Sequence, residues 1–97
     1  MNKTIRDPIF EEIDKERRHQ QDKWGNGADD AKNTPWHFTA YISQYVGKWM
    51  AGTWAPLQSD TVTAFRTAMV KVAAIAVAAI ESVDRQRAAT GKTFYEG

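Results

Sequence analysis

Few side chains in this sequence have the chemistry of a catalytic or metal-binding group, and their spacing does not assemble one. The two histidines, His19 and His37, lie in different segments, and neither has a second histidine or a set of acids at metal-ligand spacing. Surface or boundary positions are therefore expected for both. Cysteine is absent, which excludes disulfides and thiolate metal ligands. The sequence predicts no catalytic residue and no metal ligand.

Acidic residues form two clusters, and ion pairing explains both better than metal binding does. The first cluster alternates with lysines and arginines at helical spacing, as is typical of a solvated charged face: Glu11, Glu12 and Glu16. Glu81 and Asp84 form the second cluster, and they can share a cation because they lie one helical turn apart. Arg85 and Arg87 lie beside them, so ion pairs are the expected arrangement.

The remaining candidates are neutral and cationic. Gln44, Tyr45 and Lys48 are predicted to lie on a common face of one helix, opposite its apolar side. None of the three is a metal ligand of ordinary strength. The face they form is a candidate surface for a ligand or a protein partner.

A helix over residues 35–54 positions this face. Thr34 is a suitable N-cap, and Pro35 occupies the first helical position, where a missing N–H does no harm. The apolar residues of the segment recur at spacings of three and four, which predicts one buried side: Phe38, Ile42, Val46, Trp49 and Met50.

Two further helices complete the expected fold. The first spans about 8–24 and begins at Asp7-Pro8, a cap followed by proline. The third spans about 60–88, with Ser59 or Asp60 as its cap. Its middle is rich in alanine and apolar nearly all round, so we expect it to lie at the centre and to be shared with another subunit.

These elements predict an all-α protein, a small antiparallel bundle of three helices that dimerises. Residues 1–97 form one domain, because a chain of this length supports one core of moderate size. The predicted N-terminus (1–6) is frayed, a polar loop covers 25–34, and a tail (90–97) carries the aromatic pair Phe94 and Tyr95.

Composition limits the partners and the location. The formal net charge is +1 with no basic block, so strong nucleic-acid binding is not expected. The first residues are charged throughout, unlike a secretory signal. The longest apolar run, 72–80, is far short of the about 20 residues that span a membrane. We expect a cytoplasmic protein without a membrane partner.

Four stretches carry a resemblance to a known family. They are Glu16-Arg17-Arg18-His19-Gln20, then Lys23-Trp24-Gly25, then the helix over 41–50 and the helix over 66–80. Together they resemble a MazG-like protein of the all-α nucleoside triphosphate pyrophosphohydrolase superfamily, in the short form common in bacteriophages and prophages. The similarity covers residues 9–87. It implies a bundle of antiparallel helices that dimerises, and hydrolysis of nucleoside triphosphates to monophosphate and pyrophosphate with magnesium.

The resemblance also implies that the catalytic acids have been lost. The family's two acidic motifs fall on five residues that carry no carboxylate: Gln44, Tyr45, Lys48, Ala68 and Lys71. Magnesium needs hard oxygen ligands, so no cofactor is expected. Lys48 and Lys71 can instead bind phosphate as point charges, or can lie along an ordinary helix face. The candidate ligand- or partner-binding residues are Gln44, Tyr45, Lys48 and Lys71.

Three functions are compatible with these residues. In the first, the protein is a catalytically inactive phage or prophage factor in the host cytoplasm, where it binds a host protein to counter a defence system or redirect metabolism. In the second, it binds a nucleotide without hydrolysing it. In the third, it retains pyrophosphohydrolase activity with magnesium held by Asp29, Asp30 or a partner subunit. In each case a homodimer or larger assembly is expected, with 72–80 and the tryptophans of the central helix at the interface.

Overall fold

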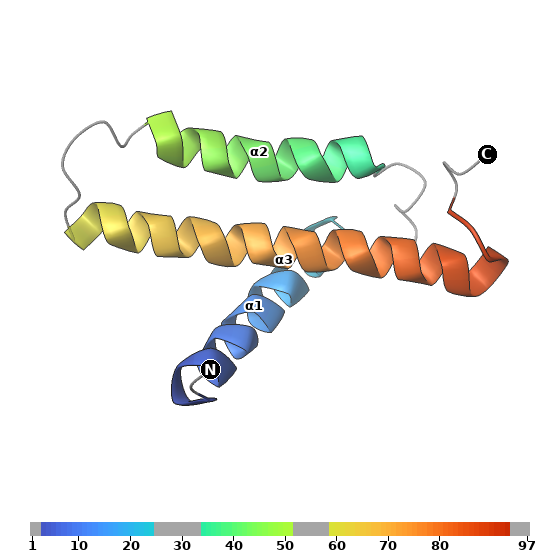
Figure 1. Ribbon diagram of the computed structural model, residues 1–97, viewed down its shortest axis with the longest axis horizontal. Coiled ribbons are helices and arrows are strands. Elements are labelled where there is room, and N and C mark those ends of the chain that lie inside the picture. Colours follow the sequence, from blue (N-terminus) through green and yellow to red (C-terminus); the bar gives the residue numbers. More distant parts are fainter. Residues whose placement is uncertain (1–2, 25–33, 52–58, 94–97) are drawn as a thin grey trace.

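The computed structural model describes residues 3–24, 34–51 and 59–93, and these form three helices without a strand. They are α1 (Lys3–Trp24), α2 (Pro35–Ala51) and α3 (Ser59–Thr90). The helices α2 and α3 run antiparallel and side by side, whereas α1 crosses α3 obliquely on its other side (Figure 1). Both α1 and α2 pack on α3. The all-α fold predicted from the sequence, with a central third helix, is confirmed.

The start of α2 follows the predicted capping pattern. The Phe38 N–H donates to the Thr34 carbonyl at 3.2 Å, which is the first hydrogen bond of the helix. The Thr34 N–H in turn donates to Nδ1 of His37 at 3.2 Å. His37 therefore takes the part that Glu or Gln plays in a capping box. The described part of α2 ends at Ala51, and the predicted end at Trp54 lies outside the described residues.

The first helix begins earlier than its proline predicts. It starts at Lys3, so residues 3–6 are helical rather than frayed, and Pro8 lies inside α1. Proline has no N–H to give the Thr4 carbonyl, but this affects only one hydrogen bond of the helix. The Arg6 guanidinium, which lies 5.5 Å from the centroid of the Phe10 ring, adds a contact between successive turns.

Helix α3 begins and ends within two residues of its predicted bounds. At its start the Asp60 carboxylate accepts from the Thr61 N–H at 2.9 Å, which satisfies one of the free N–H groups of the first turn. At its end Gly91 adopts a φ of 82° and donates its N–H to the Arg87 carbonyl at 2.8 Å. This is the left-handed cap that glycine provides at low cost.

The described core is small and partly polar. Among the residues that the structure describes, only Ala74, Ile75 and Ala78 are apolar and buried. The buried polar residues are Arg17, Gln20, Ser82, Gln86 and Thr93. In contrast, many large apolar side chains are exposed: Ile5, Phe10, Trp36, Val46, Met50, Val62, Phe65, Val77 and Ile80. Alanines at the centre let the helices approach but contribute little buried area.

The shape of the chain is extended for its length. The radius of gyration is 15.7 Å, against about 12.5 Å for a compact domain of this size. The longest helix, α3, is also long and apolar enough by composition to cross a membrane, and 17% of its most apolar stretch is buried. The central helix of a helical bundle can have the same length and apolar composition when the other helices cover only part of it.

Candidate functional site

Two of the four candidate residues meet between α2 and α3. The Lys71 ammonium lies 5.9 Å from the centroid of the Tyr45 ring. One turn further along α2, the rings of Trp49 and Phe65 lie 5.1 Å apart. Both contacts belong to one antiparallel register of α2 and α3. In this register Tyr45 lies beside Lys71, near the middle of α3.

Lys71 is also held by α1. Its ammonium lies 3.3 Å from a carboxylate oxygen of Glu16, and its backbone carbonyl accepts a hydrogen bond from the Gln20 side chain at 3.5 Å. Lys71 therefore contacts both outer helices. The Gln20 side-chain oxygen beside it is buried without a hydrogen-bond partner in the described part of the chain. This polar cluster joins the three helices where an apolar residue would ordinarily lie.

Glu16 is the residue of this cluster that the sequence interpretation missed. We expected it on a solvated face, but its side chain is 19% exposed. A signal was available, because Glu16 continues the spacing of Ile9, Ile13 and Gln20 along the side of α1 that packs on α3. The charges of its neighbours concealed that spacing.

Gln44 and Lys48 lie away from this cluster. Both are exposed on α2. Within the described residues, no side chain forms an ion pair or hydrogen bond with the Lys48 ammonium. The structure thus brings Tyr45 and Lys71 together with Glu16, and leaves Gln44 and Lys48 at solvent. Ala68 lies half-buried on α3.

Three of the acids singled out in the sequence, Glu12, Glu16 and Glu81, form ion pairs. Glu81 pairs with Arg17 of α1 at 2.6 Å, a partner far away in sequence. Glu12 accepts two hydrogen bonds from the Arg66 guanidinium, at 2.8 and 2.6 Å. These bonds hold the pKa of Glu12 below its ordinary value of 4.5 and raise the pKa of Arg66. The pairs fix the crossing of α1 over α3.

In the described ranges no three histidine, aspartate or glutamate side chains gather closely enough to hold a metal ion. Asp29 and Asp30, the acids considered for a residual enzyme, lie outside these ranges. The two histidines are exposed, in agreement with their predicted surface or boundary positions.

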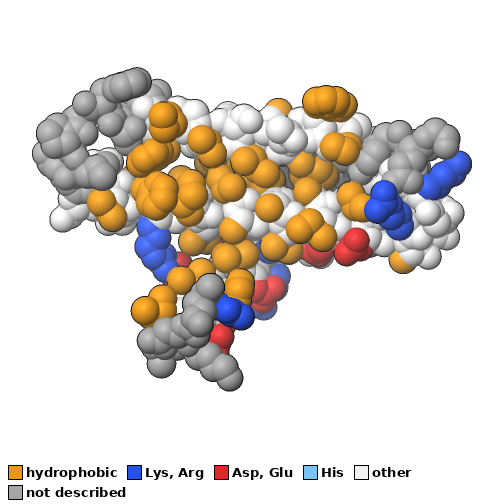
Figure 2. Space-filling model, in the orientation of Figure 1, with side chains coloured by type: hydrophobic (Ala, Val, Ile, Leu, Met, Phe, Trp, Pro, Cys, Tyr) orange, Lys and Arg blue, Asp and Glu red, His pale blue; other side chains and the backbone are white. Residues whose placement is uncertain are grey.

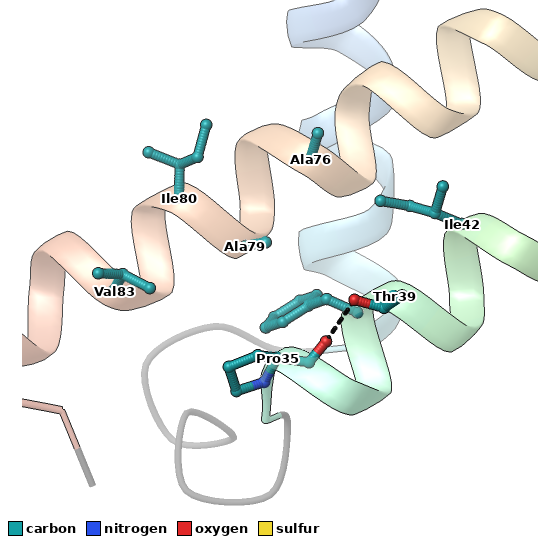
Figure 3. A pocket seen from close by; sticks show the side chains of 8 residues that line it. Pro35, Thr39, Ile42, Ala76, Ala79, Ile80 and Val83 are labelled. Atoms are coloured by element: carbon teal, nitrogen blue, oxygen red, sulfur yellow. Dashed lines mark hydrogen bonds between the residues drawn. The ribbon is translucent and has the colours of Figure 1, made fainter. Parts of the chain in front are cut away.

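Two apolar grooves open on the surface. One, of about 300 Å³, lies between α2 and α3, and the Thr39 hydroxyl at its edge donates to the Pro35 carbonyl at 2.8 Å (Figure 3). Its lining is Pro35, Phe38, Thr39, Ile42, Ala76, Ala79, Ile80 and Val83. The other, of about 280 Å³, lies between α1 and α3. Its lining is Ile9, Ile13, Arg66, Met69, Val70 and Ala73.

Comparisons with protein-family models, with curated proteins and with solved structures found no match to this chain. The resemblance to MazG-like proteins therefore rests on the sequence stretches quoted for it.

Proposed function

We propose that this protein acts by binding another protein through the outer face of α2, and not by catalysis. The observation that carries the proposal is Trp36, whose side chain is 83% exposed at the start of that helix. A tryptophan presents about 150–250 Å² of surface, and tryptophans in a binding face are frequent energetic hot spots. An exposed tryptophan on an ordered helix is therefore suited to fill a partner's pocket.

The rest of the outer face indicates the chemistry of the partner. The exposed residues around Trp36 are small, polar or cationic: His37, Ala40, Ser43, Gln44, Gly47 and Lys48. Helix α2 contains no acidic residue. A partner surface with an apolar pocket and carboxylates around it complements this face.

The resemblance to MazG-like proteins supports a role without catalysis. The positions that correspond to the family's acids carry Gln44, Tyr45, Lys48, Ala68 and Lys71, none of which supplies the carboxylates that magnesium requires. On this proposal the protein is a MazG-like pseudoenzyme of phage or prophage origin. It acts in the host cytoplasm on a host protein, as a counter-defence or host-takeover factor.

Nucleotide binding without hydrolysis is the second candidate, favoured by the contact between Tyr45 and Lys71. An aromatic ring beside an ammonium can hold a base and a phosphate. However, Glu16 lies 3.3 Å from that ammonium and neutralises part of its charge. Phosphate would have to displace this carboxylate, which makes the site weaker than two free lysines would be.

The test of protein binding compares two variants in capture experiments from host-cell lysate. Trp36→Ala should weaken the recovered complex by about 2 kcal/mol, roughly a thirtyfold rise in Kd once the partner is purified. Ile5→Ala is the control, because Ile5 is also an exposed apolar residue but lies on α1. Equal capture by the wild type and Trp36→Ala would contradict the proposal, provided that both have the same melting temperature.

A further inference from the structure

One face of α3 is covered by neither α1 nor α2. Four residues of the two grooves define it: Met69, Ala73, Ala76 and Ile80. Their spacings of four, three and four place them in one stripe along the helix. Figure 2 shows hydrophobic side chains gathered over α2, α3 and the adjoining part of α1 on one side of the molecule. We call this stripe and its two grooves the α3 face.

We propose that the α3 face binds the same face of a second copy of this chain, with the two α3 helices antiparallel about a two-fold axis between Ala73 and Ala76. This inference is independent of the proposed host-protein binding, which uses the outer face of α2. It specifies the surface and direction of the dimerisation expected from the sequence.

The accessible area argues for a partner of this size. The chain exposes 7157 Å², whereas a compact monomer of 11.0 kDa exposes about 5,600 Å². The excess is about 1,500 Å² per chain. A standard interface buries about 800 Å² on each side, and obligate dimers bury more. A second copy docked through a standard interface would remove about half of this excess, and a larger interface would remove more.

The arrangement of side chains along the stripe is self-complementary. The small residues Ala73 and Ala76 lie at its centre, where two helix axes can approach closely. Met69 precedes the first alanine by four residues, and Ile80 follows the second by four. An antiparallel pair therefore places Ile80 of each copy against Met69 of the other. Ile80 is 61% exposed and projects from α3 beside the groove shared with α2 (Figure 3).

Charge decides between the two possible directions. Arg66 lies beyond one end of the stripe and Asp84 beyond the other. Arg66 already pairs with Glu12 of its own chain, so the charge that matters is that of Asp84. In a parallel pair the two aspartates would face each other, whereas an antiparallel pair keeps them at opposite ends of the interface. Like charges facing each other in an interface are unfavourable, so the antiparallel direction is preferred.

The first experiment measures the mass in solution by light scattering at micromolar concentration. The wild type should have a mass of about 22 kDa, twice the 11.0 kDa chain. Ile80→Glu should give a monomer, because it places two carboxylates against apolar surface. Ile5→Glu is the matched control, since Ile5 is 63% exposed and Ile80 61%. This control should remain dimeric, as should Trp36→Ala, which separates the result from the host-binding test.

The second experiment tests direction with single cysteines, which is possible because the chain has none of its own. Met69→Cys and Ile80→Cys, mixed and oxidised, should form a disulfide between the two different variants. Each alone should not, because two identical positions lie about 16 Å apart along an antiparallel pair, and a disulfide requires Cα atoms within about 7 Å.

A monomeric wild type, or a dimer unaffected by Ile80→Glu, would overturn the proposal. Disulfides within each single variant would overturn the antiparallel direction. Sedimentation of the wild type with lipid vesicles, lost in Ile80→Glu while the free protein stays monomeric, would assign the α3 face to a membrane surface instead.

Discussion

The ion pair between Arg17 and Glu81 gives a prediction in which burial, and not distance, sets the cost. The Arg17 side chain is 9% exposed and that of Glu81 is 41% exposed, with 2.6 Å between the paired atoms. Glu81→Met would leave a buried guanidinium without its carboxylate. Removing one partner of a fully buried pair costs about 3–5 kcal/mol. Because Glu81 is partly solvated, we expect about 2 kcal/mol, or a fall in melting temperature of about 8–16 °C.

Replacing the other partner of the pair should cost less stability. Arg17→Met keeps the aliphatic stem and leaves a carboxylate that water can reach, so we expect a loss of about 1 kcal/mol or less. The control is the pair between Arg18 and Asp14, which has the same distance of 2.6 Å but side chains that are 71% and 64% exposed. Asp14→Asn should change the free energy of unfolding by less than about 0.5 kcal/mol.

Urea unfolding followed by circular dichroism measures all three variants. Protein concentration must be the same throughout, because self-association adds to the apparent stability. The order of cost should be Glu81→Met, then Arg17→Met, then Asp14→Asn. Equal costs for the first two, or a negligible cost for Glu81→Met, would refute the argument that the buried guanidinium depends on Glu81.

Three further predictions concern the acid range, the end of α3 and catalysis. Because the pKa of Glu12 is lowered in the folded state, its contribution to stability is present above about pH 4.5 and is lost as the pH falls through the lower folded value. Glu12→Gln should therefore flatten the acid limb of the melting temperature measured between about pH 3 and pH 7; an unchanged limb would contradict this. Gly91→Ala should cost about 1 kcal/mol in unfolding experiments, because φ is 82° and an added Cβ meets nothing within 4 Å, so the cost is conformational. No pyrophosphate release from nucleoside triphosphates with magnesium or manganese is expected; activity that survives purification and is lost on Asp29→Asn would restore the enzymatic alternative.

Local sequence signals identified the helices because capping and periodicity act within a few residues. Thr34 with Pro35 marked the start of α2, and Ser59 or Asp60 marked the start of α3. The start of α1 was misplaced because Asp7-Pro8 is a favourable beginning but not an obligatory one. A helix tolerates one missing hydrogen bond when neighbouring turns interact, as Arg6 and Phe10 do.

The candidate site was only partly predictable. The resemblance to MazG-like proteins grouped Tyr45 and Lys71 in one candidate site, and the structure brings these two residues together. Helical periodicity could not show that Glu16 reaches the Lys71 ammonium, because that contact depends on where α1 crosses α3. The pairing of Glu81 with Arg17, far away in sequence, depends on the same crossing. Nearby arginines offered simpler partners, so the sequence alone favoured a local pair.

The sequence by itself determined that three helices form and that the third is apolar on several sides, because propensity and periodicity are properties of single segments. It could not determine which of those apolar sides the other helices cover. That choice depends on the crossing of α1 and on the antiparallel register of α2, and both result from contacts between segments. The tertiary structure therefore decided that Ala74, Ile75 and Ala78 are buried while Met69, Ala73, Ala76 and Ile80 line open grooves.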